Sequence, residues 1–123
     1  MTLIDTSSFV HFLRLKGDRR AKQRVAGLLE SGAAAICEIV AVELWMGVGS
    51  SADERDIKEL CSLVSFLPLT ESVWARAKHL AARCRSDGTP VPSSDIIIAA
   101  CAFVHRASLD FEDQHFLILE KHR

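Results

Sequence analysis

Apolar positions along the chain fall into short runs, separated by longer stretches in which apolar residues recur every three or four positions. A short apolar run between polar residues is typical of a buried strand, whereas the longer spacing indicates a helix with one buried face. The runs predict five strands, at residues 2–4, 33–37, 66–69, 107–109 and 116–119. Pro68 cannot donate a backbone hydrogen bond, so we expect the third strand at an edge of the sheet.

The stretches between these runs predict helices, most of which begin near a residue that can cap the first turn. The predicted helices cover residues 6–15, 18–30, 39–48, 51–64, 71–85 and 93–104. The expected caps are Thr6, Ser7 or Ser8 for the first helix, Ser51 in a capping box, Thr70, and Ser93 or Ser94; the second helix is expected to start at Asp18 or Arg19. Residues 96–104 are apolar on every side, so we expect this helix to be central.

Strands alternate with helices along the whole chain. This order predicts an α/β protein, a three-layer sandwich in which helices flank a central, mainly parallel sheet. The length of 123 residues fits one domain, covering residues 1–123. Sheets of this kind bind ligands outside the carboxyl ends of their strands, so functional residues are expected there.

Composition and charge narrow the possible functions. Hydrophobic residues make up 49% and charged residues 25% of the chain, which is typical of a globular protein. The longest apolar run has nine residues, too few to cross a bilayer, and the first residues do not resemble a signal peptide. We therefore expect a soluble cytoplasmic protein that does not enter membranes. The net charge of −1 excludes binding of nucleic acid through overall positive charge.

Four cysteines, at positions 37, 61, 84 and 101, have no CxxC spacing. We therefore expect reduced thiols rather than a zinc site or a disulfide framework.

Four acidic residues occur where a purely structural carboxylate is not expected. Asp5 ends the first strand, Asp95 lies in the first turn of the apolar helix, and Asp113 follows the strand at 107–109. Glu43 is the only charged residue among the eleven from position 39 to 49, and an isolated charge there is expensive to bury. Each acid alone has a plain alternative as a helix cap or a surface group. Strand carboxyl ends and helix amino ends share one rim of such a sheet, so we expect all four to converge.

A cluster of carboxylates repels itself unless a cation neutralises it. Oxygen ligands without a His or Cys pair favour Mg²⁺, with Mn²⁺ as the other possibility, and we expect Asp5, Asp95 and Asp113 as the metal ligands. An ion held in this way activates water and neutralises charge on a phosphodiester, which indicates a nuclease. Asp5, Glu43, Asp95 and Asp113 are the expected catalytic residues.

The chain resembles the PIN-domain ribonucleases and, among them, the VapC-type toxins of toxin–antitoxin modules. The resemblance spans the chain and rests on four short motifs in order: Leu3-Ile4-Asp5-Thr6-Ser7, residues 39–47 around Glu43, residues 91–100 around Asp95, and Asp113-Gln114-His115-Phe116. His115 occupies a position where some members carry a second acid, which leaves its role open. The resemblance implies the sandwich fold described above, with an acidic pocket at one end of the sheet.

The same resemblance implies an endoribonuclease that cuts a transfer or ribosomal RNA. It also implies silencing by a VapB-type antitoxin, whose C-terminal segment wraps the toxin and can place a basic residue in the acidic pocket. A homodimer is expected from it as well. Phe9, Phe12 and Leu13 form an apolar stripe beside Asp5. This stripe is either part of the core or a surface that a partner contacts.

Supporting roles are expected for hydroxyl and basic residues near these acids. Thr6 and Ser7 can donate to Asp5 or to a bound water, and Ser93 can hold a water while capping its helix, although capping alone also explains all three. Six cations lie between positions 14 and 24, which suggests a track for RNA phosphates, or else a solvated helix face. The residues expected to contact RNA are Arg14, Lys16, Arg19 and Arg20. The five histidines lack metal-ligand spacing and are expected in packing or surface roles.

The sequence thus predicts a Mg²⁺-dependent endoribonuclease toxin. Two alternatives stay open: a PIN-type nuclease of RNA maturation that has no antitoxin, and a non-catalytic α/β interaction module. A receiver-like signalling domain would need an acid pair after the first strand and a late lysine in order, and a dehalogenase-type phosphatase would need DxD there. Asp5-Thr6-Ser7 offers one acid, so neither of these two classes fits.

Overall fold

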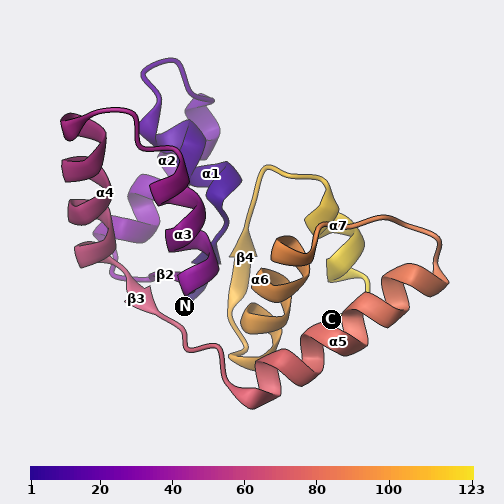
Figure 1. Cartoon of the computed structure of the whole chain (residues 1–123). Helices are drawn as coiled ribbons and strands as arrows, with labels where there is room; N and C mark the ends of the chain where they lie inside the picture. Colours follow the sequence, from indigo (N-terminus) through magenta and orange to yellow (C-terminus); the bar gives the residue numbers. More distant parts are fainter.

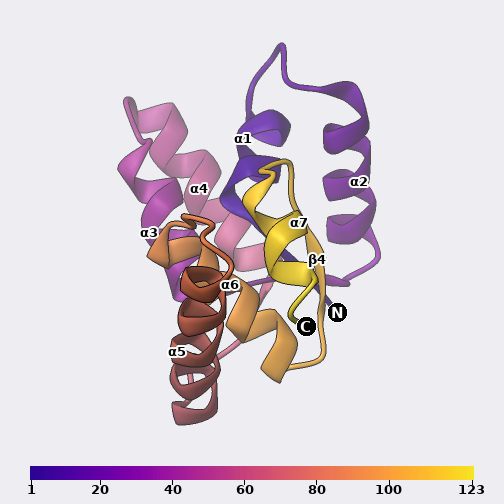
Figure 2. The same ribbon diagram turned by 90° about the vertical axis from the view of Figure 1, so that its right-hand side faces the viewer.

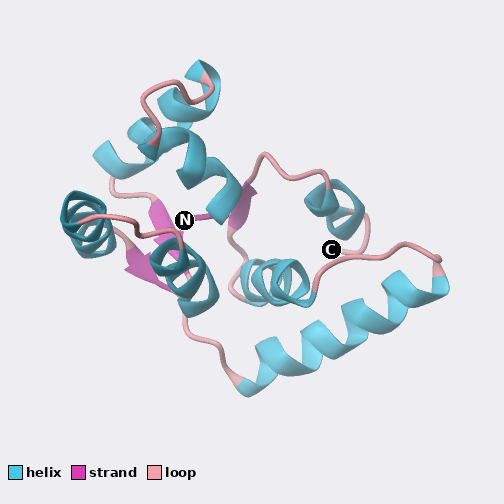
Figure 3. Ribbon diagram, turned by 45° about the horizontal axis from the view of Figure 1, so that its top comes forward, coloured by secondary structure: helices cyan, strands magenta, loops and turns pink.

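A computed structural model describes all 123 residues as four short parallel strands and seven helices. The strands are β1 (Thr2–Ile4), β2 (Ala34–Ile36), β3 (Ser65–Phe66) and β4 (Ser108–Asp110). The helices are α1 (Thr6–Leu13), α2 (Arg19–Glu30), α3 (Glu38–Met46), α4 (Ser51–Leu63), α5 (Glu71–Ser86), α6 (Ser93–Val104) and α7 (His115–Glu120). The strands form a small sheet among the helices (Figure 3).

The sheet has the strand order β3-β2-β1-β4, and every pair in it is parallel. Leu3 of β1 lies opposite Ala35 of β2 on one side and Leu109 of β4 on the other. Crossovers between parallel strands are right-handed. Because the chain moves outward from β1 to β3 and then returns to β4, the helices divide between two faces. Helices α1 to α4 lie on one side, and α5 and α6 lie on the other (Figure 1), which confirms the three-layer α/β prediction.

The helix predicted to be central is α6. Ile98, Ala99 and Cys101 are fully buried in it, and α6 packs against α5, α7 and β4. Phe9 of α1 and Phe116 of α7 are the largest side chains that are completely buried. The core therefore joins the first and last parts of the chain.

Some helix caps differ from the prediction. Asp5 itself caps α1, because its carboxylate accepts from the Ser7 backbone, so Thr6, Ser7 and Ser8 lie inside the helix. Ser50 rather than Ser51 caps α4, and Thr70 caps α5 as predicted. Helix α2 starts at Arg19, one of the two predicted positions, and Asp18 caps it. Helix α6 follows Pro92 and has no side-chain cap, so capping by Ser93 or Ser94 was wrong. Proline suits this position because the first turn needs no backbone donor from it.

The predicted strand at residues 116–119 is wrong, because this segment is part of helix α7. Phe116 and Leu119 are fully buried while Leu117 is exposed, and a separation of three residues places two side chains on one face of a helix. A four-residue apolar run contains too little periodicity to distinguish the two structures. The edge position of the 66–69 strand is confirmed, although β3 itself covers only residues 65 and 66.

Two expectations from composition can be compared with the structure. None of the seven helices combines the length and the apolar character that a membrane crossing requires. All four cysteines are free thiols, and Cys37, Cys84 and Cys101 are buried.

Candidate active site

The carboxyl ends of β1 and β4 lie on one rim of the sheet because these strands are parallel neighbours. Helix α6 runs back toward the start of β4, so its amino end reaches the same rim (Figure 1). This topology brings Asp5, which follows β1, to the same place as Asp95 in the first turn of α6. Asp113, in the loop after β4, and Glu43 from α3 complete the group.

Asp5 is only 3% exposed, which makes its ionised form costly. Its Oδ2 accepts from the Ser7 hydroxyl at 2.6 Å and from the Ser7 backbone nitrogen at 3.1 Å. Burial raises the pKa of Asp5, the Ser7 bonds lower it in part, and the charge of Asp113 raises it further. These bonds fix the orientation of the carboxylate.

The Ser7 hydroxyl connects Asp5 to the segment between β4 and α7. While donating to Asp5, its oxygen accepts from the backbone nitrogens of Glu112 at 3.0 Å and Asp113 at 3.2 Å. The loop that carries Asp113 consequently lies over the start of α1 (Figure 2). Ser7, predicted as a supporting residue, is therefore in direct contact with one of the four acids and with the backbone of another.

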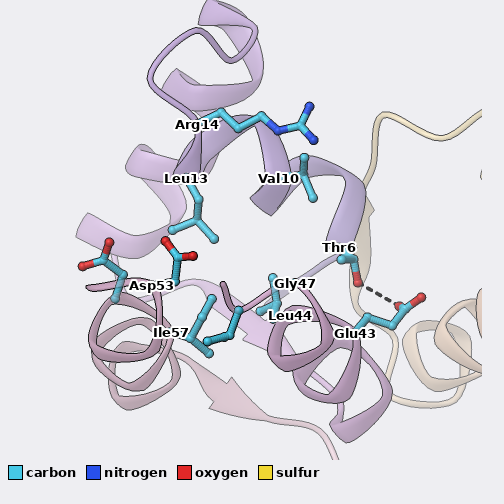
Figure 4. A pocket seen from close by; sticks show the side chains of 11 residues that line it. Thr6, Val10, Leu13, Arg14, Glu43, Leu44, Gly47, Asp53 and Ile57 are labelled. Atoms are coloured by element: carbon cyan, nitrogen blue, oxygen red, sulfur yellow. Dashed lines mark hydrogen bonds between the residues drawn. The ribbon is translucent and has the colours of Figure 1, made fainter. Parts of the chain in front are cut away.

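Glu43 is half-buried on α3, less enclosed than its apolar neighbours in the sequence suggest. Its Oε1 accepts from the Thr6 hydroxyl at 2.8 Å (Figure 4). Burial is the main reason that the pKa of Glu43 is raised; the Thr6 bond lowers it, and the charge of Asp5 raises it. Thr6 and Ser7 thus hold one acid each.

Asp95 is 7% exposed and has the most strongly raised pKa of the four acids. Burial, followed by the charges of Asp5 and Asp113, raises this pKa from 3.8 to about 6, against a lowering effect of His115. The negative charges of Asp5 and Asp113 therefore disfavour ionisation of Asp95. Ser93, two residues earlier, is exposed, and its side chain makes no hydrogen bond to the acids.

His115 is the residue that the sequence prediction missed. Its Nδ1 lies 3.1 Å from Oδ2 of Asp95 and 2.9 Å from Oδ1 of Asp113. One ligand atom from each of these three side chains lies within 4.8 Å of the other two. The signal in the sequence was its position two residues after Asp113, at the start of an apolar segment.

A second group of charges supports the loop after β4. Asp110 is 8% exposed; it accepts from the Ser8 hydroxyl at 2.7 Å and from Nε of Arg24 at 3.0 Å. Arg24 also forms an ion pair with Glu112. Arg24 was counted in the cationic segment, but this pairing takes it away from any phosphate track. Arg14, Lys16, Arg19 and Arg20 are exposed, which leaves them accessible.

A cavity of about 260 Å³ lies beside the acidic rim, between α1, α3 and α4. Thr6 and Glu43 form one end, and Asp53 and Ile57 the other (Figure 4). Arg14 is also part of the lining, as are apolar side chains of α1 and α3. Phe9 is fully buried and Phe12 half-buried, so the expected apolar stripe on α1 is mainly core.

The sequence from residue 2 to 121 matches the family described as the PIN domain. The chain belongs to the PIN-domain family. No curated protein matches this PIN domain in sequence. Several solved structures have the same fold as this chain.

FitAcB from Neisseria gonorrhoeae is 23% identical, with a TM-score of 0.81 over 98% of this chain and 94% of that one. VapBC2 from Rickettsia felis, bound to a DNA fragment from its promoter, is 18% identical, with a TM-score of 0.78 over 92% and 87%. VapBC-1 from nontypeable Haemophilus influenzae is 19% identical, with a TM-score of 0.77 over 98% and 92%. At these identities the likeness shows a shared fold.

Proposed function

We propose that this PIN domain is a metal-dependent endoribonuclease of the VapC type, the toxin of a type II toxin–antitoxin system. The observation that carries the proposal is the convergence of Asp5, Glu43, Asp95 and Asp113, from four separate segments, on one rim of the sheet. Membership of the PIN family supports nuclease chemistry at this rim.

The donor set fits a hard divalent cation. Asp5, Asp95 and Asp113 offer carboxylate oxygens, and Mg²⁺ or Mn²⁺ binds such oxygens. Burial, followed by the charges of neighbouring acids, raises the pKa values of Asp5 and Asp95, and a bound cation would offset both effects. When bound, the ion supplies an activated water and neutralises charge on the phosphodiester during its displacement.

The side chains of the chain have distinct tasks in this proposal. Ser7 holds Asp5 and the loop before Asp113 at a fixed separation. Thr6 holds Glu43, whose raised pKa suits a base that orients the attacking water and takes its proton. We assign contacts with RNA phosphates, which do not read sequence, to Arg14, Lys16, Arg19 and Arg20, and the exposure of all four supports this role.

An antitoxin partner is proposed for the cavity between α1, α3 and α4. The similar solved structures include proteins described as toxin–antitoxin complexes and VapBC assemblies. The cavity has apolar walls for a partner helix, and acidic groups at both ends, Glu43 and Asp53, that favour a basic side chain. We therefore propose a VapB-type segment that occupies this cavity and silences the enzyme in the cytoplasm.

A homodimer is also proposed. Val42, Trp45 and Met46 of α3 are exposed, Met46 at 80%, and they line one apolar hollow on the surface of this helix. Exposed apolar patches of this kind mark protein interfaces. Light scattering on the purified chain measures its mass directly, and a monomer at micromolar concentration would contradict the proposal.

The nuclease proposal is tested by incubating the purified protein with cellular RNA and mapping new RNA ends. We expect discrete cleavage in Mg²⁺ or Mn²⁺, no cleavage in EDTA, and none from Asp5→Asn. Glu59→Gln, which changes an exposed acid on α4, should cleave like the wild type. Cleavage by the Asp5 variant would mean that the acids are structural.

The toxin proposal needs a separate measurement in cells. Expression of the wild type should stop growth, and co-expression of a small antitoxin encoded beside it should restore growth. RNA cleavage without growth arrest would instead favour a nuclease of RNA maturation.

A further inference from the structure

His115 places a nitrogen among the carboxylates of the acidic rim. Its Nδ1 is 3.1 Å from Asp95 and 2.9 Å from Asp113. Adjacent ligands of an octahedral ion with bonds of about 2.1 Å lie about 3 Å apart. Nδ1 therefore lies at the spacing of a neighbouring ligand from each carboxylate, and the three ligand atoms lie within 4.8 Å of one another.

The position of the imidazole is set by the fold. The His115 backbone nitrogen donates to Oδ1 of Asp113 at 2.9 Å, which ties the first residue of α7 to the acidic loop. The next residue, Phe116, is fully buried and stacks on Phe111 at a centroid distance of 5.4 Å. His115 itself remains partly exposed, with 38% of its side-chain surface accessible. The residue is therefore anchored through its backbone while its ring stays in contact with solvent.

The chemistry of the ring decides which ion this arrangement favours. A neutral imidazole carries its proton on either ring nitrogen, so Nδ1 has a lone pair available when the proton is on Nε2. Mg²⁺ prefers oxygen ligands, whereas imidazole suits the first-row transition metals, and affinity in that series rises from Mn²⁺ onward. A histidine also brings no negative charge, which removes part of the attraction that holds Mg²⁺.

We propose that His115 Nδ1 is a direct ligand of the bound ion, together with Asp95 and Asp113, and that it makes this PIN domain prefer Mn²⁺ to Mg²⁺. The inference rests on the proposed function, since it assigns the metal of the same site. A different arrangement is that the imidazole merely occupies the place of the ion and competes with it. The two arrangements predict opposite effects when the ring is removed.

The first experiment uses the wild-type protein without RNA. Mn²⁺ is added to metal-free protein, and pulsed EPR measures coupling between the manganese electrons and ligand nitrogen. We expect a histidine nitrogen coupling that is lost in His115→Ala and kept in His79→Ala, which removes an exposed histidine of α5. No nitrogen coupling, or no binding of Mn²⁺ at millimolar concentration, would overturn the proposal.

Calorimetry then compares Mn²⁺ and Mg²⁺ on three proteins. The wild type should bind Mn²⁺ at least tenfold more tightly than Mg²⁺. His115→Ala should weaken Mn²⁺ binding at least tenfold and Mg²⁺ binding much less, and His115→Asp should remove most of the preference by strengthening Mg²⁺ binding. Tighter binding of both ions by His115→Ala would show that the ring competes with the metal. Circular dichroism confirms that each variant is folded.

The binding results are separable from nuclease activity. Nitrogen coupling in a protein that cuts no RNA would uphold the ligand assignment and refute the proposed function. RNA cleavage by a protein whose bound Mn²⁺ shows no nitrogen coupling would uphold the proposed function and refute the ligand assignment.

Discussion

Asp95→Asn measures how strongly the acidic rim is destabilised by its own charge in metal-free buffer. Burial and the nearby charges of Asp5 and Asp113 raise the pKa of Asp95 from 3.8 to about 6. The folded protein therefore keeps this proton at a pH where the unfolded chain has released it. Because the unfolded state then binds fewer protons, this group makes the stability of the wild type fall as the pH rises from about 4 to about 6.

The raised pKa of Asp95 also determines how much the free energy of unfolding changes with pH. A tenfold change in proton affinity corresponds to about 1.4 kcal/mol, so the rise at Asp95 corresponds to about 3 kcal/mol once the group is ionised. Asparagine has nearly the same shape and stays neutral. The free energy of unfolding of Asp95→Asn relative to the wild type should therefore increase by up to about 3 kcal/mol between pH 4 and pH 7.

Urea unfolding in EDTA, followed by circular dichroism at several pH values, gives this difference directly. Glu59→Gln makes the same carboxylate-to-amide change on an exposed face and should parallel the wild type at every pH. A difference between Asp95→Asn and the wild type that stays constant with pH, or that shrinks as the pH rises, would refute the reasoning. Saturating Mn²⁺ or Mg²⁺ should instead stabilise the wild type most.

Three further predictions follow from the same contacts. Glu43→Gln should abolish RNA cleavage and slightly raise the melting temperature of the metal-free protein. This rise should be smaller than that of Asp95→Asn, because Glu43 is only half-buried. Thermal melts and cleavage assays on one preparation test this, and cleavage at the wild-type rate would contradict it. EDTA should stop cleavage without unfolding the protein, and metal at about 100 times its Kd should add about 2.7 kcal/mol to the free energy of unfolding; cleavage that persists in EDTA would refute the metal requirement. Arg24→Gln should destabilise the fold by roughly 2 kcal/mol, since it leaves the buried Asp110 carboxylate without its cation; urea unfolding measures it, with Arg20→Gln as the exposed control.

Most of the fold could be predicted because its strands and helices have distinct hydrophobic patterns. The alternation of short apolar runs with helical stretches was sufficient to predict the sandwich with its parallel sheet. The apolar segment of α6 was sufficient to predict that this helix is central. The segment at 116–119 failed because its structure is decided by packing of Phe116 and Leu119 into the core. The sequence of these four residues alone does not indicate how they pack.

The approach of Asp5 and Asp113 to each other could be predicted because their positions follow from topology. Asp5 and Asp113 follow neighbouring parallel strands, and that placement is readable from the order of elements. His115 could not be placed, because its contact with Asp95 depends on where α7 begins and how it packs. The pairing of Arg24 with Asp110, 86 residues later, is equally invisible before the tertiary structure is known.

The bond between Ser7 and the backbone of Asp113 has a consequence for how the protein is made. These residues are separated by 106 positions, so a ribosome completes nearly all of the described chain between them. Until β4 is synthesised and pairs with β1, the first acid has neither its neighbour on the rim nor the loop that Ser7 binds. A chain that ends before β4 lacks Asp113 and His115 and cannot assemble this rim. The group of four acids can therefore be completed only after β4 and the loop that follows it have been synthesised.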